Sequence, residues 1–145
     1  MYDPILVQPM RDELTSLGIK ELRTADDVDA AMRQEGTTLV VVNSACGCAA
    51  GAARPGIALS RRHPVQPDHT VTVFAGQDKE ATERARTYFT NQPPSSPSIA
   101  LMRDGELVHF IPRHFVEGRS PEMIAQALEF AFDEFCADRM PSRPE

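Results

Sequence analysis

The sequence predicts one α/β domain whose mixed sheet is covered by helices on both faces. Segments with strand patterns alternate with segments with helix patterns, which is typical of a mainly parallel sheet. The run 37–42 is β-branched without polar alternation, as in a central strand buried on both sides. An Asp104-Gly105 pair between two further strands indicates a β-hairpin, which adds antiparallel pairing at one edge.

The first half of the chain predicts two helices, two strands and then a turn. No element is expected in residues 1–8, and Pro9 suits the first position of a helix that Gly18 ends. Thr24 with Asp27 three residues later is a capping-box pattern, which starts a second helix. The expected elements are therefore a helix over 9–17, a strand over 19–22, a helix over 25–35 and the strand over 37–42.

The small residues of 43–54 predict a turn that leads into a helix. Pro55 should bend or interrupt that helix and Gly56 should loosen it. Ser120 is a favoured N-cap, with Pro121 at the first position of the last helix. The remaining expected elements are a strand over 70–75, a helix over 78–91, the hairpin strands 99–103 and 106–111, and a last helix whose core stripe is Ile124, Ala127, Leu128, Ala131, Phe132 and Phe135.

This order is that of a thioredoxin-like fold with an extra helix in front. The expected architecture is a three-layer sandwich with a mixed sheet, a C-terminal β-hairpin and helix, and an extra N-terminal helix. We expect residues 1–145 to form a single domain, because 145 residues is an ordinary length for one domain. The last residues, about 139–145, contain two prolines and are expected to be a disordered tail.

Composition excludes several classes of function. Fifteen Lys and Arg against 21 Asp and Glu give a net charge of -6, which argues against a nucleic-acid partner. No apolar run approaches the length of a membrane span, and the N-terminus lacks a signal-peptide pattern, so we expect a cytoplasmic protein without membrane contact. Three cysteines are too few for a disulfide scaffold, which favours redox or metal chemistry.

The chemistry centres on Cys46-Gly47-Cys48, where a central strand leads into a helix. The free N–H groups and the dipole at a helix start favour a thiolate, which is the nucleophile in disulfide exchange. Gly47 supplies the backbone freedom that a Cys-x-Cys pair needs to bring its sulfurs together. No charged side chain lies between Asn43 and Ala53, so the thiolate should depend mainly on the helix start, with Arg54 too far along for a role.

Two other interpretations of the cysteines stay open at this point. One is a metal-binding module that uses Cys46 and Cys48, although no histidine shows a paired spacing with them. The other is an interaction domain whose cysteines control assembly, for example a homodimer linked through Cys136. Cys136 lies at the end of the last helix, where the helix dipole disfavours a thiolate, so it is either an inert thiol or an auxiliary one.

Two further loops are candidate parts of the site. Ser96-Pro97 precedes a strand, and an X-Pro bond there is able to be cis. In a thioredoxin-like fold this loop lies against the cysteine turn, so Ser96 and Pro97 are expected to bind the substrate backbone. His114, next to Arg113, is expected either to lie in a solvated loop or to bind an anionic thiol.

Nearly the whole chain resembles the bacilliredoxin family, small thioredoxin-like proteins with a Cys-Gly-Cys motif. The segments that carry the resemblance are 7–11, 37–51, 71–82, 94–98, 109–114 and Cys136. The resemblance implies exchange with bacillithiol, a low-molecular-weight thiol that serves as co-substrate, with no bound cofactor and no metal. It implies that Cys46 attacks a protein–bacillithiol mixed disulfide on a client protein, and that Cys48 or free bacillithiol then clears the adduct.

The same resemblance places Pro97 at the cis position and suggests a weak disulfide isomerase activity. One departure from the family is the longer tail, residues 137–145, which follows Cys136. That tail puts the role of a terminal thiol in doubt.

Overall fold

Five strands form one mixed sheet in the computed structural model, which describes residues 1–137. The strand order is β1-β3-β2-β4-β5, with parallel pairing of β1 with β3 and of β3 with β2, and antiparallel pairing of β2 with β4 and of β4 with β5. The predicted mixed sheet with a C-terminal hairpin is therefore confirmed. The predicted disordered tail, about 139–145, lies outside the described residues.

The elements follow the predicted order. The helices are α1 (Pro4–Thr15), α2 (Ala25–Met32), α3 (Arg54–Ser60), α4 (Lys79–Thr87) and α5 (Pro121–Phe135), with a π-helical turn at Ala49–Ala53 and a 3-10 turn at Arg113–Phe115. The strands are β1 (Lys20–Glu21), β2 (Thr37–Asn43), β3 (His69–Phe74), β4 (Ser98–Arg103) and β5 (Glu106–Ile111). No helix among the described residues is long and apolar enough to span a bilayer.

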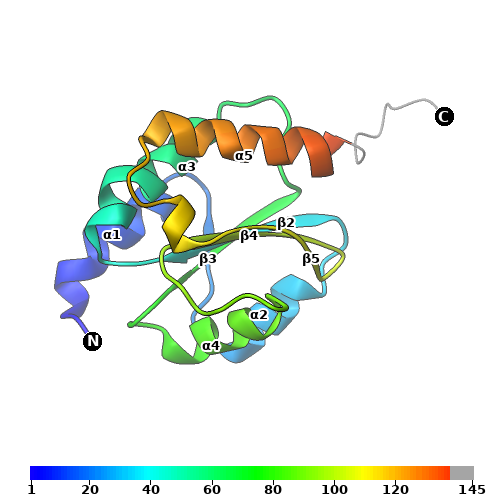
Figure 1. Ribbon diagram of the computed structural model, residues 1–145. Coiled ribbons are helices and arrows are strands. Elements are labelled where there is room, and N and C mark those ends of the chain that lie inside the picture. The colour runs from blue at the N-terminus through cyan, green and yellow to red at the C-terminus, as the bar shows by residue number, and fades with distance from the viewer. Residues whose placement is uncertain (138–145) are drawn as a thin grey trace.

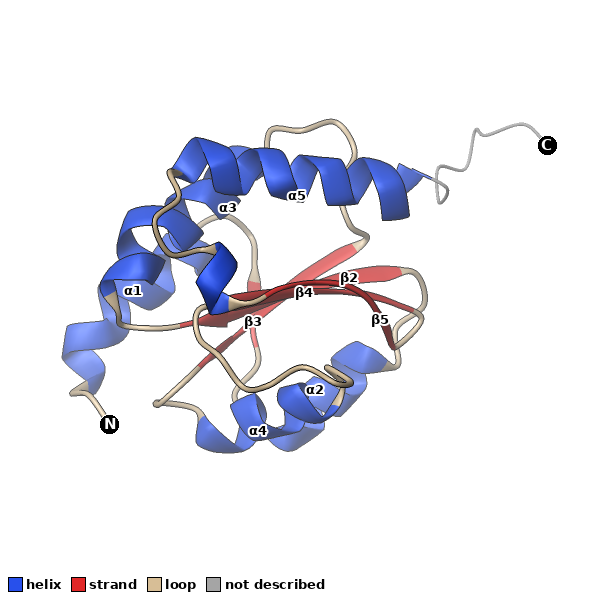
Figure 2. Cartoon of the chain, viewed as in Figure 1, coloured by secondary structure: helices blue, strands red, loops and turns tan. Residues whose placement is uncertain are grey.

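Helices cover both faces of the sheet, so the molecule has three layers. Figure 1 shows α1, α3 and α5 on one face and α2 and α4 on the other, and Figure 2 shows the strands between them. Every residue of β2 is buried, because its successive side chains point to opposite faces of the sheet and helices cover both faces. Leu39 and Val41 enter the core beneath α3 and α5, whereas Val40 and Val42 enter the core on the α2 and α4 side.

Three local patterns that we used as predictors are confirmed. The Thr24 side chain accepts a hydrogen bond from the Asp27 N–H at 3.1 Å, and Ser120 does the same for Met123 at 3.2 Å. In the hairpin turn both Asp104 and Gly105 have positive φ, 50° and 83°. These are the dihedrals of the type I′ turn that Asp-Gly favours.

The N-terminal helix corrects the prediction for residues 1–8. It begins at Pro4 rather than Pro9, because Asp3 caps it by accepting a hydrogen bond from the Ile5 N–H. Pro9 lies inside the helix, and the buried stripe is Val7, Arg11 and Leu14. The Asp3-Pro4 pair was the missed signal, since Pro at the first position after an Asp cap is a normal helix start.

Two smaller predictions are also wrong. Helix α4 ends at Thr87 instead of Asn91, whose φ of 63° belongs to the left-handed region. In α5, Ala127 is exposed and Ala125 takes the buried position. Ile124, Leu128, Ala131 and Phe132 of the expected stripe are buried.

Helix α3 runs through Pro55 and Gly56 without a break. The Pro55 nitrogen has no hydrogen to donate, and the backbone just before it widens into the π-helical turn. Gly56 does not loosen the helix. It allows α3 to approach α5, because a Cβ at this position would lie 2.5 Å from Ile124 Cβ and 3.0 Å from the Pro121 carbonyl oxygen.

We expect Gly56→Ala to destabilise the protein by about 2 kcal/mol, since overpacking a close helix contact costs roughly 1–3 kcal/mol. The measurement is the midpoint of urea unfolding. Gly51→Ala is the matched control, because its Cβ would meet nothing within 4 Å. That control should leave the stability unchanged or raise it by up to ~1 kcal/mol through helix propensity. Equal midpoints for the two variants would contradict the close approach.

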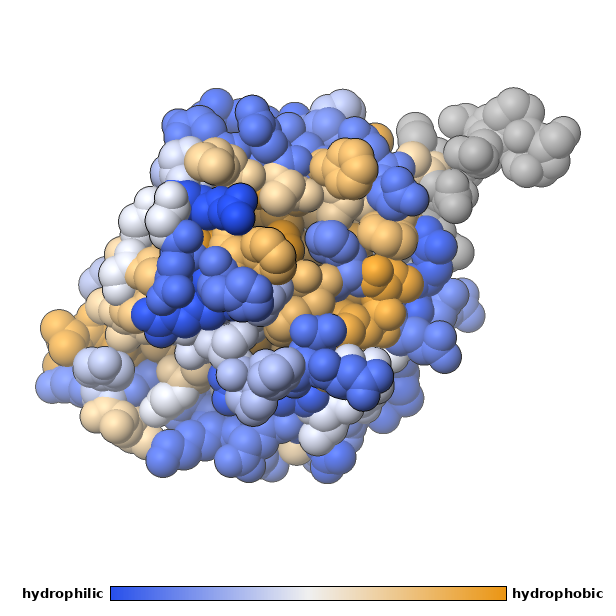
Figure 3. Space-filling view, viewed as in Figure 1, coloured by the Kyte–Doolittle hydropathy of each residue, from blue (hydrophilic) through white to orange (hydrophobic). Residues whose placement is uncertain are grey.

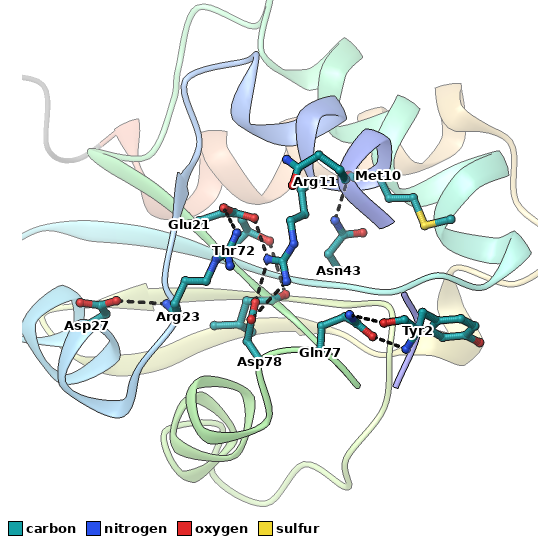
Figure 4. Close-up of polar contacts among 12 residues, drawn as sticks. Tyr2, Met10, Arg11, Glu21, Arg23, Asp27, Asn43, Thr72, Gln77 and Asp78 are labelled. Carbon is teal, nitrogen blue, oxygen red and sulfur yellow. Dashed lines mark hydrogen bonds and ion pairs between the residues drawn. The ribbon is translucent and has the colours of Figure 1, made fainter. Parts of the chain in front are cut away.

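A buried arginine fastens α1 to the sheet. Arg11 is 6% exposed, and its guanidinium lies 2.8 Å from carboxylate oxygens of both Glu21 and Asp78. Figure 4 shows this side chain pointing from α1 between the two acids, and it shows Tyr2 and Gln77 exchanging two further hydrogen bonds. The extra N-terminal helix is therefore held against β1 and the start of α4.

Candidate functional site at the Cys46-Gly47-Cys48 turn

Cys46 occupies the capping position of the helix that follows β2. Helical geometry begins at Gly47, and the N–H groups of Ala49 and Ala50 both donate to the Cys46 carbonyl oxygen at 3.2 Å. The Cys46 side chain therefore takes the place that Ser or Asp takes at an ordinary N-cap, facing the N–H groups of Cys48 and Ala49 in the first turn. The sequence prediction of a thiol at a helix start is confirmed.

The surroundings of Cys46 favour its thiolate form. Burial raises the pKa of this thiol, but the Ser44 hydroxyl, the N–H groups of Ala49 and Cys48 and the charge of Arg113 oppose it. The net effect is a pKa below the ordinary value. Because the thiolate is the reactive form, Cys46 has the electrostatics of a nucleophile in disulfide exchange. Both Cys46 and Cys48 are half-buried free thiols in this structure.

Arg54 supports the cysteine turn from its buried side. Its guanidinium is 3% exposed and donates to the Ser44 carbonyl oxygen at 2.7 Å and to Asn43 Oδ1 at 3.1 Å. Ser44 in turn accepts from the Cys46 N–H through its hydroxyl at 3.1 Å. Arg54 is not among the groups that lower the pKa of Cys46, but the helix turns it back towards the end of β2, where it holds the turn, a role that was not expected.

Helix α1 also supports the cysteine turn. Its Glu13 pairs with Arg54 at 2.9 Å, and its Met10 carbonyl oxygen accepts a hydrogen bond from Asn43 Nδ2 at 3.2 Å. These contacts cross from residues 10–13 to residues 43–54, so no local pattern in the sequence signals them. The extra N-terminal helix thus fixes the strand end from which Cys46 projects.

The Ser96-Pro97 peptide bond is cis, as the fold assignment and the resemblance predict. Ser95 precedes it, and its hydroxyl accepts from the Arg113 N–H at 3.3 Å. Ile99 pairs with Ile111 across the hairpin, so the residues just before β4 meet the residues just after β5. The loop is thereby joined to the chain around Arg113.

Arg113 links this loop to the cysteines. One guanidinium nitrogen lies 3.8 Å from Cys48 Sγ and another lies 3.2 Å from the Ser96 carbonyl oxygen. The third nitrogen, Nε, pairs with Glu117 at 2.9 Å. The structure therefore brings Cys46, Cys48 and Ser96 into one site around Arg113. From the sequence, Arg113 was expected to act only together with its neighbour His114, which is exposed. The register of the hairpin was the signal that locates it.

Cys136 is not part of this site. It is 3% exposed and interacts with Thr37, the first residue of β2, whereas Cys46 follows the last residue of that strand. A seven-residue strand is on the order of 20 Å long. Burial raises the pKa of the Cys136 thiol. The structure does not bring this thiol to Cys46 or Cys48.

An apolar hollow of about 200 Å³ lies between β5 and α5. Figure 3 shows apolar side chains gathered on this face of the molecule. Phe115 and Met123 border the hollow and are each about half exposed, at 50% and 47%.

Among residues 1–137, no group of three or more His, Cys, Asp or Glu side chains is arranged to hold a metal ion.

Comparison with known proteins matches the chain over nearly its whole length. The family described as disulphide isomerase matches residues 2–136. The chain is 57% identical to a bacilliredoxin of Koribacter versatilis, covering 94% of each protein. It is 54% identical to a bacilliredoxin of Geobacillus kaustophilus, covering 95% of this chain and 94% of the relative.

Solved structures agree with the fold assignment. Thioredoxin of Fasciola hepatica matches with a TM-score of 0.57 at 17% identity, over 81% of this chain and 99% of that structure. At this identity the match shows the thioredoxin fold alone. The predicted thioredoxin-like fold is confirmed.

Proposed function

The chain belongs to the bacilliredoxin family and is a thiol–disulfide oxidoreductase, and we propose that it removes bacillithiol from mixed disulfides on client proteins. Cys46 is the proposed nucleophile and Cys48 the proposed resolving thiol. The observation that carries the proposal is the capping position of Cys46, where N–H groups, the Ser44 hydroxyl and Arg113 together lower its pKa.

In the first step the Cys46 thiolate attacks the bacillithiol sulfur of the client mixed disulfide. A disulfide forms between Cys46 and bacillithiol, the client disulfide breaks, and the client sulfur leaves as a thiolate that takes up a proton. The client cysteine is thereby reduced and Cys46 carries the bacillithiol group. The lowered pKa of Cys46 favours this step because more of the thiol is ionised at neutral pH.

In the second step the Cys48 thiolate attacks the Cys46 sulfur. The Cys46–Cys48 disulfide forms and bacillithiol leaves as its thiolate, so the cysteine pair is oxidised and bacillithiol is reduced. A thiol reductant then returns the pair to its dithiol form. Alternatively, a second bacillithiol attacks the adduct, which releases oxidised bacillithiol and frees Cys46 directly.

The loop of Ser96 and Pro97 is the proposed binding site for the client backbone. Arg113 and Ser95 hold the loop beside the cysteine pair, which supports this role. A client strand lying along the loop would present its mixed disulfide to Cys46. We place this chemistry in the cytoplasm, where low-molecular-weight thiols keep cysteines reduced.

The test uses a model client that carries bacillithiol on its single cysteine, with a glutathione-carrying copy as the matched substrate. Intact-mass measurement should show the bacillithiol mass leaving the client in the presence of the reduced protein, faster than the glutathione mass leaves its copy. An unchanged client mass after long incubation, with the protein's thiols still free, would contradict bacillithiol removal.

Disulfide isomerase activity is the second candidate, favoured by the description of the matched family. In that reaction Cys46 attacks a non-native protein disulfide, and a client thiol later displaces it, so no net oxidation takes place. Recovery of activity by a client with scrambled disulfides measures it. No recovery beyond that with bacillithiol alone would remove this candidate.

A further inference from the structure

The guanidinium of Arg113 contacts both the cysteine pair and the loop that contains the cis proline. Arg113 directs one nitrogen to Cys48 Sγ at 3.8 Å and another to the Ser96 carbonyl oxygen at 3.2 Å. Its backbone N–H donates to the Ser95 hydroxyl at 3.3 Å. The side chain therefore spans from the sulfur of the second cysteine to the loop on the other side of the site.

An ordinary surface arginine does not explain this arrangement. The ion pair of Arg113 with Glu117 is partly exposed, at 41% and 50% of the side chains, and an exposed pair of this kind contributes little to stability. The pair uses Nε alone. The other two guanidinium nitrogens are therefore left for Cys48 and Ser96.

The fold places Arg113 here with little freedom. Pro112 fixes the backbone between the end of β5 and the 3-10 turn that begins at Arg113. Ile111 is paired with Ile99 in the hairpin, so the direction of the chain at this point is set by the sheet. The backbone of Arg113 is thus part of an ordered turn that follows the sheet rather than of a free loop.

We propose that Arg113 is a catalytic residue that stabilises the negative charge passing between the sulfurs of the cysteine pair. The proposal rests on the proposed roles of Cys46 and Cys48. In the resolving step the charge starts on Cys48, the Cys46–Cys48 bond forms as the bond from Cys46 to bacillithiol breaks, and the electron pair leaves on bacillithiol. Arg113 contacts the sulfur at which this step begins.

Loss of a cation that contacts the reacting sulfur is expected to slow the resolving step about tenfold. The neighbouring charges do not substitute for Arg113. The Arg54–Glu13 pair lies behind Ser44, and Glu117 is negative. Arg113 also contributes to the lowered pKa of Cys46.

The test compares Arg113→Gln, Arg113→Lys and Glu117→Gln. The first readout is the pH profile of iodoacetamide alkylation of Cys46 in a Cys48→Ala background, which needs no bacillithiol. We expect Arg113→Gln to move the midpoint of this profile to higher pH, because the charge of Arg113 is one of the groups that lower the pKa of Cys46. Arg113→Lys should restore part of the shift by its charge. Glu117→Gln, the matched control, keeps the cation and should stay close to the parent protein.

The second readout is the release of the thiol from a preformed mixed disulfide on Cys46, with Cys48 present. We expect Arg113→Gln to slow this release about tenfold at neutral pH. Urea midpoints for all variants show whether they fold as the parent protein does.

The proposal is overturned if folded Arg113→Gln keeps both the parent midpoint and the parent release rate. It is also overturned if Glu117→Gln loses as much as Arg113→Gln, because the ion pair rather than the cation would then matter. If bacillithiol removal fails while Arg113→Gln still shifts the alkylation profile, the function proposed above is wrong and the effect of Arg113 on the cysteine pair stands.

Discussion

Cys46→Ser is expected to reduce the removal of bacillithiol from a client to the uncatalysed background. A serine hydroxyl at this position accepts the same helix N–H groups, so the turn should keep its structure. It supplies no thiolate, however, and the thiolate is the nucleophile of the first step. The measurement is the rate at which the client loses the bacillithiol mass, with the urea midpoint as the check on folding.

Cys136→Ser is the matched control for this loss. Cys136 is buried at the opposite end of β2, beside Thr37, and does not approach the cysteine turn. We therefore expect full activity from this variant. Activity of Cys46→Ser above a tenth of the parent rate would mean that Cys48 is able to make the first attack. Loss of activity in Cys136→Ser at an unchanged urea midpoint would show that Cys136 is an auxiliary thiol of the reaction.

The position of the cysteine pair was predictable because the information is local. A buried strand followed by small residues and Cys-Gly-Cys places both thiols at a helix start, which is where the structure has them. The cis bond at Pro97 needed one further step, the fold assignment, because the dipeptide alone does not distinguish cis from trans.

The charges around the thiols were not predictable in the same way. Arg54 returns to Ser44 only because the helix after the turn reverses direction, and Arg113 reaches Cys48 across 65 residues of sequence. Both contacts depend on how elements pack, and neither follows from spacing along the chain. The prediction that the helix start is the main support of the thiolate therefore omitted Ser44 and Arg113.

The limits of the fold prediction have a similar origin. The hairpin and the caps at Thr24 and Ser120 are local devices and are confirmed. Gly56 was expected to loosen its helix because propensity alone was considered, whereas its role is set by Ile124 of another helix. A glycine needed for close approach has no local signature that separates it from a flexible one.

Cys48→Ser is expected to trap the protein with one bacillithiol on Cys46. The first step is unaffected, because the lowered pKa of Cys46 depends on the Ser44 hydroxyl, on backbone N–H groups and on Arg113 rather than on the Cys48 thiol. The second step loses its nucleophile, and the serine hydroxyl stays protonated near neutral pH. Without free bacillithiol, the adduct should accumulate to one per chain.

Intact-mass measurement followed by peptide mapping locates the adduct and gives its lifetime. In the parent protein the same incubation should leave the Cys46–Cys48 disulfide and no adduct. Added bacillithiol should clear the trapped variant slowly, because it must attack Cys46 from solution, whereas Cys48 of the parent protein is held two residues further on at the same helix start. A variant that clears the adduct at the parent rate would show that bacillithiol, and not Cys48, resolves the mixed disulfide. Cys48 would then have only a structural role at the start of the helix.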